Sequence, residues 1–200
     1  MTITPYTSDL RKEWETFISG AVNSALIHYR DYLEYHGDRF NDCSVMIYER
    51  EELLAVFPAE KEGLRVYSHR GITFGDLIVK HSLAKSTLQH LIQSLSKYFS
   101  DLGFQTLQIR SIPEFYWKDL TDYSNYQEVL QISGFVPIQT KRFQTIKLPI
   151  IINDRGRKWG IRKASNLGFQ LKKKVQLIAF GIRYLSQTYG IPTNPNLPIA

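Results

Sequence analysis

The feature that most constrains the fold is a series of three short apolar runs in the first half of the chain. The runs VMIYE (45–49), LLAVFPAE (53–60) and LRVYSH (64–69) are rich in β-branched and aromatic residues, and the polar breaks REE and KEG separate them. Runs of this kind are typical of antiparallel strands joined by tight turns. The segment GITFGDLIV (71–79) continues as an extended stretch with glycines at its bends. We therefore expect an antiparallel sheet at the centre of the fold.

Helical spacing of apolar residues predicts helices on both sides of these strands. An amphipathic helix is predicted over 9–23 and a short second one over 29–36. The longest apolar stripe predicts a helix over 82–101, followed by a strand over 104–112 and a helix over 123–133. Helices that back a mostly antiparallel sheet define an α+β fold.

The last third of the chain is predicted to hold strands and then two basic helices. Residues 135–149 alternate like a pair of strands, and residues 156–167 favour a short helix. A final helix is predicted over 173–189 from an apolar stripe that consists of Val175, Ile178, Ile182, Leu185 and Tyr189. We expect a first domain over 1–150 and a basic helical extension over 151–200.

Charge is distributed unevenly along the chain. Residues 1–140 hold 13 Lys/Arg and 18 Asp/Glu, a net charge of −5, whereas residues 141–200 hold 12 Lys/Arg and the single acid Asp154, a net charge of +11. Two interpretations remain open for this asymmetry. The C-terminal part contacts an anionic partner, or it is a solvated basic face without a dedicated partner.

Composition and motifs exclude several classes of protein. A composition of 43% hydrophobic and 22% charged residues is that of a globular protein and not of a disordered one. No apolar run approaches about 18 residues, so no transmembrane span is expected, and the N-terminus lacks the pattern of a secretory signal. The single cysteine, Cys43, excludes an intrachain disulfide, and the five histidines show no metal-binding spacing. The expected protein is cytoplasmic and metal-free.

Five motifs occur in an order that points to a family. They are HGDRFND (36–42), LLAVFPA (53–59), SHRGITFGDLI (68–78), IPEFY (112–116) and RGRKWGIRKASNLGF (155–169). On these motifs the chain resembles the FemAB-like acyltransferases of the GNAT superfamily over roughly residues 10–190. The resemblance implies a GNAT-like, mostly antiparallel sheet flanked by helices. Relatives continue into a second GNAT-like domain, so residues 151–200 are expected to include the start of one.

The chain departs from the family pattern in two places. Relatives usually carry a Gly-Gly pair where this chain has Gly75-Asp76. The usual GNAT phosphate loop, Arg/Gln-x-x-Gly-x-Gly/Ala ahead of a helix, has no counterpart in this sequence. Two functional hypotheses follow. One is an N-acyltransferase, and the other is a non-catalytic binding or partner module that retains the fold without a donor site.

The resemblance implies transfer of an acetyl or aminoacyl group from acyl-CoA or aminoacyl-tRNA to an amine of a cell-envelope or surface-polysaccharide precursor. Such a reaction needs a positioned amine, a route for its proton and donors for the oxyanion. His69 is the candidate base, and Tyr116 is the candidate acid toward the leaving thiolate. The alternatives are a histidine hydrogen-bonded within a turn and a tyrosine that only lines a pocket.

A further set of residues is assigned to substrate binding: His36, Asp38, Arg39, Ser68, Gly71, Thr73 and Gly75. The polar members would hold an anionic or hydroxylated substrate, and the glycines would allow its close approach. The alternatives are that Asp38 and Arg39 fix the corner between a helix and a strand and that the glycines only form turns. Cys43 is better interpreted as a buried small apolar residue than as a nucleophile.

The basic residues assigned to phosphate binding are Arg155, Arg157, Lys158, Arg162 and Lys163. They are expected to contact phosphates of CoA or tRNA. A second interpretation places them, with the lysines of 172–174, on an anionic membrane surface near a lipid-linked amino-sugar substrate, at the inner face of the membrane. A third is that the last helix covers a further domain. The sequence leaves the oligomeric state open.

Overall fold

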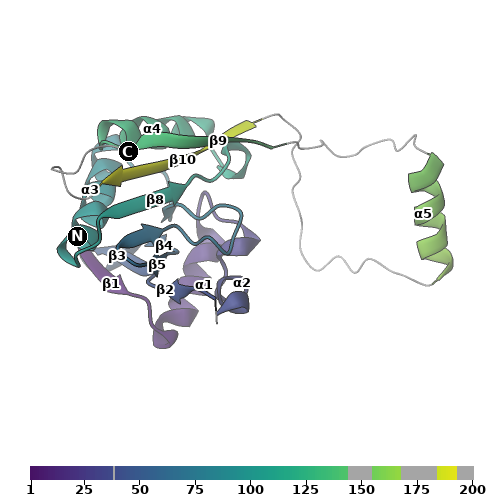
Figure 1. The fold of residues 1–200 in the computed structure, drawn as a ribbon, viewed down its shortest axis with the longest axis horizontal. Helices are drawn as coiled ribbons and strands as arrows, with labels where there is room; N and C mark the ends of the chain where they lie inside the picture. The colour runs from purple at the N-terminus through teal and green to yellow at the C-terminus, as the bar shows by residue number, and fades with distance from the viewer. Residues whose placement is uncertain (38, 144–154, 168–183, 193–200) are drawn as a thin grey trace. The chain divides into compact units, whose positions relative to one another are not determined.

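The computed structural model describes residues 1–37, 39–143, 155–167 and 184–192 of the chain (Figure 1). Contacts between residues divide the chain into one unit of Met1–Arg142 with Leu185–Ala200 and a second unit of Phe143–Tyr184. The expected domain boundary at residue 150 lies outside the described residues and stays a prediction.

The strands account for most of the first unit. They are β1 (Thr2–Pro5), β2 (Asn41–Asp42), β3 (Val45–Glu49), β4 (Glu52–Phe57), β5 (Glu60–Glu62), β6 (Arg65–Tyr67), β7 (Ile78–Val79), β8 (Thr106–Arg110), β9 (Val136–Phe143) and β10 (Tyr184–Pro192). The helices are α1 (Arg11–Gly20), α2 (Arg30–Leu33), α3 (Lys85–Asp101), α4 (Leu120–Ile132) and α5 (Arg155–Asn166). Short 3₁₀ helices are η1 (Ser8–Leu10), η2 (Leu26–His28), η3 (Glu34–His36) and η4 (Glu114–Tyr116).

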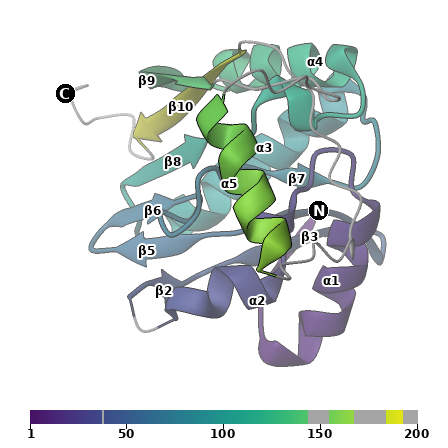
Figure 2. The same cartoon turned by 90° about the vertical axis from the view of Figure 1, so that its right-hand side faces the viewer.

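The strands form two sheets. One has the order β1-β3-β4-β7, and the other has the order β2-β5-β6-β8-β10-β9, whose strands from β5 to β9 can be followed in Figure 2. The pairs of known register are antiparallel apart from β6 and β8, which run parallel. The predicted α+β fold with a mostly antiparallel sheet is therefore confirmed.

The polar breaks form the turns that the sequence predicts. Arg50 and Glu51 join β3 to β4, and both have positive φ angles, +49° and +77°. Two consecutive residues with positive φ match the twist of a two-residue hairpin. Gly63 supplies a positive φ of +55° between β5 and β6, where a residue without Cβ adopts this geometry at low cost.

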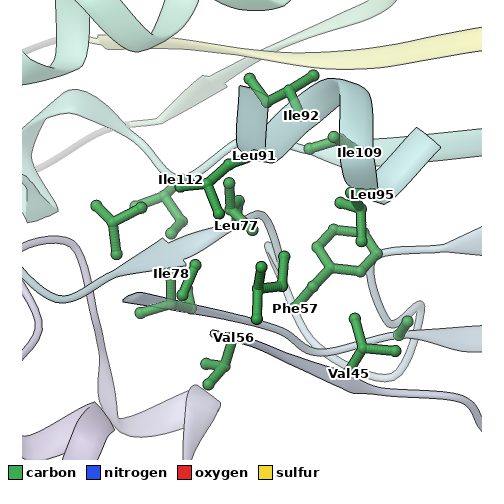
Figure 3. Packing of buried hydrophobic residues seen from close by; sticks show 14 of the residues in the cluster. Val45, Val56, Phe57, Leu77, Ile78, Leu91, Ile92, Leu95, Ile109 and Ile112 are labelled. Atoms are coloured by element: carbon green, nitrogen blue, oxygen red, sulfur yellow. The ribbon is translucent and has the colours of Figure 1, made fainter. Parts of the chain in front are cut away.

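Helix α3 covers the apolar face of the sheet. Leu91 and Leu95 are fully buried, and Figure 3 shows them above β4, the strand that carries Val56 and Phe57. The Phe57 ring lies 6.2 Å from that of Phe99 on α3. The helical stripe that predicted this element is therefore the stripe that packs on the core, as the amphipathic pattern requires.

The predicted helix over 173–189 is wrong in its C-terminal part. Residues from Tyr184 onward form β10, which pairs antiparallel with β8 from Thr188↔Arg110 to Pro192↔Thr106. The segment is rich in Tyr, Thr and Ile, which favour strands. Pairing with a buried neighbour strand overrides a weak helical spacing because tertiary contacts dominate such short segments. The rest of the predicted helix, 173–183, lies outside the described residues.

Two other expectations are corrected in extent. The extended segment predicted over 71–79 is a strand only at Ile78–Val79, and the residues before it form a bent loop. The strand pair predicted over 135–149 is the single strand β9 as far as Phe143, and its remainder lies outside the described residues. The basic helix predicted over 156–167 is confirmed by α5.

Candidate functional site

A buried arginine organises a polar cluster between α2 and the strands β1 and β2. Arg30 is only 2% exposed. Its guanidinium donates to Glu34 at 2.9 Å, to the Ser44 hydroxyl at 3.2 Å and to the Asp42 carboxylate. The Tyr6 ring stacks on it, with the guanidinium carbon 3.8 Å from the ring centroid. Pairing of this kind compensates for the loss of water around a buried charge.

A pocket of about 330 Å³ opens beside this cluster. Its lining includes Thr7, Ser8, Glu34, Phe40, Asp42 and His69. Two buried polar atoms of lining residues, Tyr6 Oη and His69 Nδ1, have no hydrogen-bond partner within the described structure. Buried polar atoms are normally satisfied, so two residues of the pocket lining each carry an unused hydrogen-bonding group, next to the carboxylates of Glu34 and Asp42.

His69 lies just after β6 with a positive φ of +57° and is 2% exposed. Its ring packs against that of Phe40 at 5.3 Å. Burial lowers the pKa of His69 below its ordinary value, although the carboxylates of Asp42 and Glu60 act in the opposite direction. The imidazole is therefore neutral near pH 7 and able to accept a proton. Its predicted catalytic role stays a prediction, and the residue lines the pocket of about 330 Å³.

The glycines of the loop after β6 are required by contacts within the protein. A Cβ at Gly75 would lie 1.9 Å from the carbonyl oxygen of Ser68, and one at Gly71 would lie 2.6 Å from the Phe40 ring. Ser68 is also engaged, because its N–H donates to Gln108 O at 2.9 Å and its hydroxyl accepts from Arg110 N–H at 2.7 Å. These contacts give Ser68 and Gly75 a structural role, and their predicted substrate contacts remain predictions.

Asp76 is a site residue that the sequence did not reveal as such. It is fully buried with φ +82°, and its carboxylate accepts from Leu77 N–H and Ile112 N–H, each at 2.9 Å, and from the Tyr126 hydroxyl. Burial raises the pKa of Asp76 to about 6. A positive φ favours glycine, so the aspartate here holds a backbone conformation that side chains rarely adopt. Here the carboxylate ties the loop to the end of β8.

A second pocket of about 480 Å³ is largely aromatic. It is lined by Leu26, Tyr29, Asp31, Tyr32, Tyr35 and Gly71. Gly71 thus borders this pocket while the neighbouring His69 borders the first one. Thr73, the remaining loop residue assigned to substrate binding, is exposed.

Tyr116 lies apart from His69. It is on η4, 39% exposed, with its ring 4.9 Å from that of Phe74 and 4.8 Å from that of Phe115. Burial raises the pKa of Tyr116 above its ordinary value, so the phenol is protonated and able to donate. The structure brings both predicted catalytic residues to the loop after β6, but Tyr116 lines neither of the two pockets.

The predicted cluster of His36, Asp38 and Arg39 is only partly visible. Arg39 is exposed between η3 and β2, whereas Asp38 and the His36 side chain lie outside the described residues. Three other members of the motif, Gly37, Phe40 and Asp42, line the pocket, and Asp42 also contacts Arg30. Arg30 was missed because a helical arginine gives no sequence signal of burial.

The basic helix α5 exposes the residues assigned to phosphate binding. Arg155, Lys158, Arg162 and Lys163 are exposed, and the Arg157 side chain lies outside the described residues. The Lys163 ammonium lies 5.0 Å from the Trp159 ring centroid. This helix belongs to the second unit and is described by itself.

Helix α3 begins after the segment 80–84, which contains no glycine. Its N-cap, Ala84, has no side chain that bonds the first N–H groups, so these donors are available to an anion. Nearby cations are paired with carboxylates, Lys80 with Glu52 at 2.9 Å and Lys85 with Glu128 at 2.6 Å. The first N–H groups of α3 are therefore able to bind a phosphate, whereas the nearby lysines are already paired with carboxylates.

Two absences hold within the described part of the chain. No group of three or more His, Cys, Asp or Glu side chains is placed to hold a metal ion. Among the same residues, no helix is both long and apolar enough to cross a membrane.

Comparison with known proteins identifies the fold. No protein-family model matches the sequence, and no curated protein does. The structure is similar to the ribosomal-protein-S18-alanine N-acetyltransferase from Escherichia coli, with TM-score 0.52, 11% identity and 99% of each chain covered. It is also similar to aminoglycoside 6'-acetyltransferase type Ii, with TM-score 0.53, 13% identity, and 98% of this chain and 100% of that chain covered. An aminoglycoside 6'-N-acetyltransferase complexed with coenzyme A gives TM-score 0.51, 10% identity, and 99% and 100% coverage. At these identities the similarity establishes the fold alone, and it confirms the predicted GNAT-like architecture.

Proposed function

We propose that this chain, which has the GNAT fold, is an N-acyltransferase that moves an acyl group from acyl-CoA to an amine bound beside His69. The observation that carries the proposal is the pocket of about 330 Å³, whose lining combines the buried His69, with an unpartnered Nδ1, and the carboxylates of Glu34 and Asp42. The similarity to solved acetyltransferases, one of them complexed with coenzyme A, supports the reaction class and the donor.

In the proposed reaction the amine nitrogen attacks the thioester carbonyl carbon. A C–N bond forms, the C–S bond breaks, and His69 Nδ1 accepts the proton that the amine loses. A neutral imidazole suits this role because a base must be unprotonated at the working pH. The leaving thiolate must gain a proton; Tyr116 has a protonated phenol but lines neither pocket, so its predicted role as that acid stays a prediction.

The lining of the pocket favours a hydroxylated amine as acceptor. Glu34 and Asp42 line the pocket, and both pair with Arg30, while Glu34 also pairs with Arg11 at 2.7 Å; Thr7 and Ser8 add two hydroxyl groups. Carboxylates and hydroxyls accept hydrogen bonds from ammonium groups and from other hydroxyls. Together with the FemAB-like motifs, this supports an amino sugar of a cell-envelope or surface-polysaccharide precursor as substrate.

A second candidate function is a non-catalytic binding module with the same fold. The observation that favours it is the segment 80–84, KHSLA, which leads into α3 without the glycines of a phosphate loop. Such a module would retain the amine pocket and lack donor binding.

The test is turnover with acetyl-CoA and a panel of amino sugars and aminoglycosides. Replacement of His69 by Gln should lower kcat roughly 10²-fold if His69 is the base. The exposed His90 on α3 provides the control, and His90→Gln should leave kcat unchanged. Turnover by His69→Gln equal to that of the wild type, with an unchanged Tm, would remove His69 from the chemistry.

Isothermal titration separates the two candidate functions. An N-acyltransferase should bind acetyl-CoA and turn over at least one amine. A chain that binds an amine but neither binds acetyl-CoA at millimolar concentration nor shows turnover would be a binding module.

A further inference from the structure

Three tyrosines at and around α2 line the second pocket, of about 480 Å³, which we call the tyrosine pocket. Tyr29 directly precedes α2, Tyr32 lies within it and Tyr35 lies on η3, so a tyrosine recurs at every third residue. Tyr32 is 46% exposed and Tyr35 is 78% exposed, although both side chains are large and aromatic. Exposed aromatic side chains that gather around a hollow are typical of a ligand site.

The three tyrosines form a row along the pocket. Each residue advances by about 1.5 Å along the axis of an α-helix and by about 2.0 Å along that of a 3₁₀ helix, so Tyr29 and Tyr35 lie roughly 10 Å apart along this axis. Such a row is longer than a single hexose ring and matches the length of a disaccharide. Leu26, which is also exposed, extends the same lining. The shape of the pocket therefore fits an elongated ligand.

The chemistry of this lining fits a sugar better than a cation or an alkyl chain. The face of a tyrosine ring is negatively polarised and attracts the C–H groups on the apolar face of a sugar ring, while phenol hydroxyls exchange hydrogen bonds with sugar hydroxyls. A cation would need an unpaired carboxylate, whereas the carboxylate of the described lining, Asp31, already pairs with Arg11. An alkyl chain would gain nothing from the phenol hydroxyls.

The tyrosine pocket is adjacent to the pocket that His69 lines. Gly71 lines the tyrosine pocket, and its Cα atom is at most about 7 Å from that of His69, two residues earlier in the chain. A Cβ at Gly71 would lie 2.6 Å from the Phe40 ring and 2.9 Å from His69 Cε1. Gly71 therefore packs directly against two residues that line the other pocket, and the loop of residues 69–71 borders both pockets.

We propose that the tyrosine pocket is a saccharide site and that the acceptor is an amino sugar within a disaccharide or a longer glycan. The sugar that bears the amine occupies the pocket beside His69, and the next sugar passes Gly71 and stacks on Tyr32. The position of the amine rests on the proposed function, whereas the saccharide site rests on the lining of the tyrosine pocket. The chain should therefore prefer an amino disaccharide to the corresponding amino monosaccharide.

The first test compares chitobiose, a disaccharide of glucosamine, with glucosamine itself as acceptors. The wild type should show the higher kcat/KM for chitobiose. Tyr32→Ala should lower the ratio of the two kcat/KM values about 5-fold, the effect of one aromatic contact, and Tyr32→Phe, which keeps the ring, should retain the preference. The control is Leu102→Ala, which removes an exposed apolar side chain that lines neither pocket and should show the wild-type ratio. A wild-type ratio in Tyr32→Ala would overturn the saccharide site.

The second test is isothermal titration with cellobiose, a disaccharide that has no amine and probes the tyrosine pocket independently of acyl transfer. The wild type should bind cellobiose, and Tyr32→Ala should bind it about 5-fold more weakly. Binding of cellobiose without turnover of any amine would support the saccharide site and contradict the proposed function. Turnover of glucosamine without binding of cellobiose would overturn the saccharide site and leave the proposed function intact. A preference for long-chain alkyl amines over chitobiose that Tyr32→Ala loses would indicate an apolar tail on the tyrosines and would also overturn the saccharide site.

Discussion

Asp76 combines a carboxyl group without access to water and a backbone conformation that side chains rarely adopt. Its pKa of about 6, above the ordinary 3.8, means that the folded state favours the protonated form. The stability that this preference gives is complete below pH 4 or so and is lost as the pH rises through about 6. The burial of this acid was not predictable from the sequence, because TFGDLI (73–78) resembles any loop that leads into a strand.

We predict that Asp76→Asn changes the pH dependence of stability. The free energy of unfolding, measured with urea between pH 4 and pH 7, should fall less with rising pH in the variant than in the wild type. The amide keeps an acceptor for a backbone N–H and does not ionise. Parallel curves for the two proteins would contradict the assignment.

The ionisation of His28 is predicted to change stability in the opposite direction over the same pH range, lowering it as the pH falls. It is fully buried between Ala25 N–H and Phe74 O, and burial lowers its pKa to about 4. A base with a lowered pKa gives stability that is complete above its ordinary pKa of 6.5 and is lost as the pH falls toward about 4. His28→Asn should therefore flatten the loss of stability in acid. A variant that denatures in acid as steeply as the wild type would show that other groups dominate.

Gly75 permits a direct test of close packing. A methyl group there would meet the Ser68 carbonyl at 1.9 Å, so Gly75→Ala should destabilise the fold by about 3 kcal/mol. Gly20→Ala is the matched control because no atom lies within 4 Å of the added Cβ. Thermal melts should show a lower Tm for the first variant and little change for the second; similar melts would show that the loop moves to accommodate the methyl group.

Helix α2 is held to the sheet by the buried guanidinium of Arg30. Arg30→Ala should destabilise the protein by about 3 kcal/mol, because it removes the buried guanidinium that pairs with Asp42 and Glu34 and donates to Ser44. Lys97→Ala is the control, since its pair with Asp101 on α3 is exposed and such pairs contribute little. Urea denaturation measures both. A loss for Arg30→Ala no larger than that for Lys97→Ala would show that the cluster is not structural.

Elements with strong local signals were predictable, and those that depend on distant partners were not. The hairpin of β3 and β4 and the helix α3 follow from alternation, turn residues and a long apolar stripe. The prediction for the segment of β10 was wrong because its partner β8 lies more than 70 residues earlier in the chain, and the spacing of apolar residues does not reveal that pairing. At the candidate site, His69 was predicted from its residue type, whereas the burial of Arg30 has no signal in the sequence.

The charge asymmetry of the whole chain leads to a prediction about partners. In α5, Arg155, Lys158, Trp159 and Arg162 share one helical face by their spacing, and Trp159 is 64% exposed. A basic face with a central tryptophan suits an anionic lipid surface, so we propose that α5 brings the chain to the membrane face. Each basic residue near such a surface contributes about 1 kcal/mol.

Vesicle sedimentation checks this proposal. The chain should bind vesicles that contain phosphatidylserine and not vesicles of phosphatidylcholine alone, and binding should fall as salt rises. Replacement of Arg155, Lys158, Arg162 and Lys163 by Gln should abolish binding with an unchanged Tm. Binding to tRNA and not to anionic vesicles would favour the nucleic-acid interpretation of the same residues.

The order of the second sheet has a consequence for the synthesis of the protein. β10 lies between β8 and β9, although the ribosome makes both of those strands first. Until residue 192 has left the ribosome, β8 and β9 have no strand between them, and each presents unpaired N–H and C=O groups to the cell. The sheet is therefore completed only after β10 has been translated. In a nascent chain arrested before residue 184, β8 and β9 would each have an unpaired edge that can bind strands of other chains.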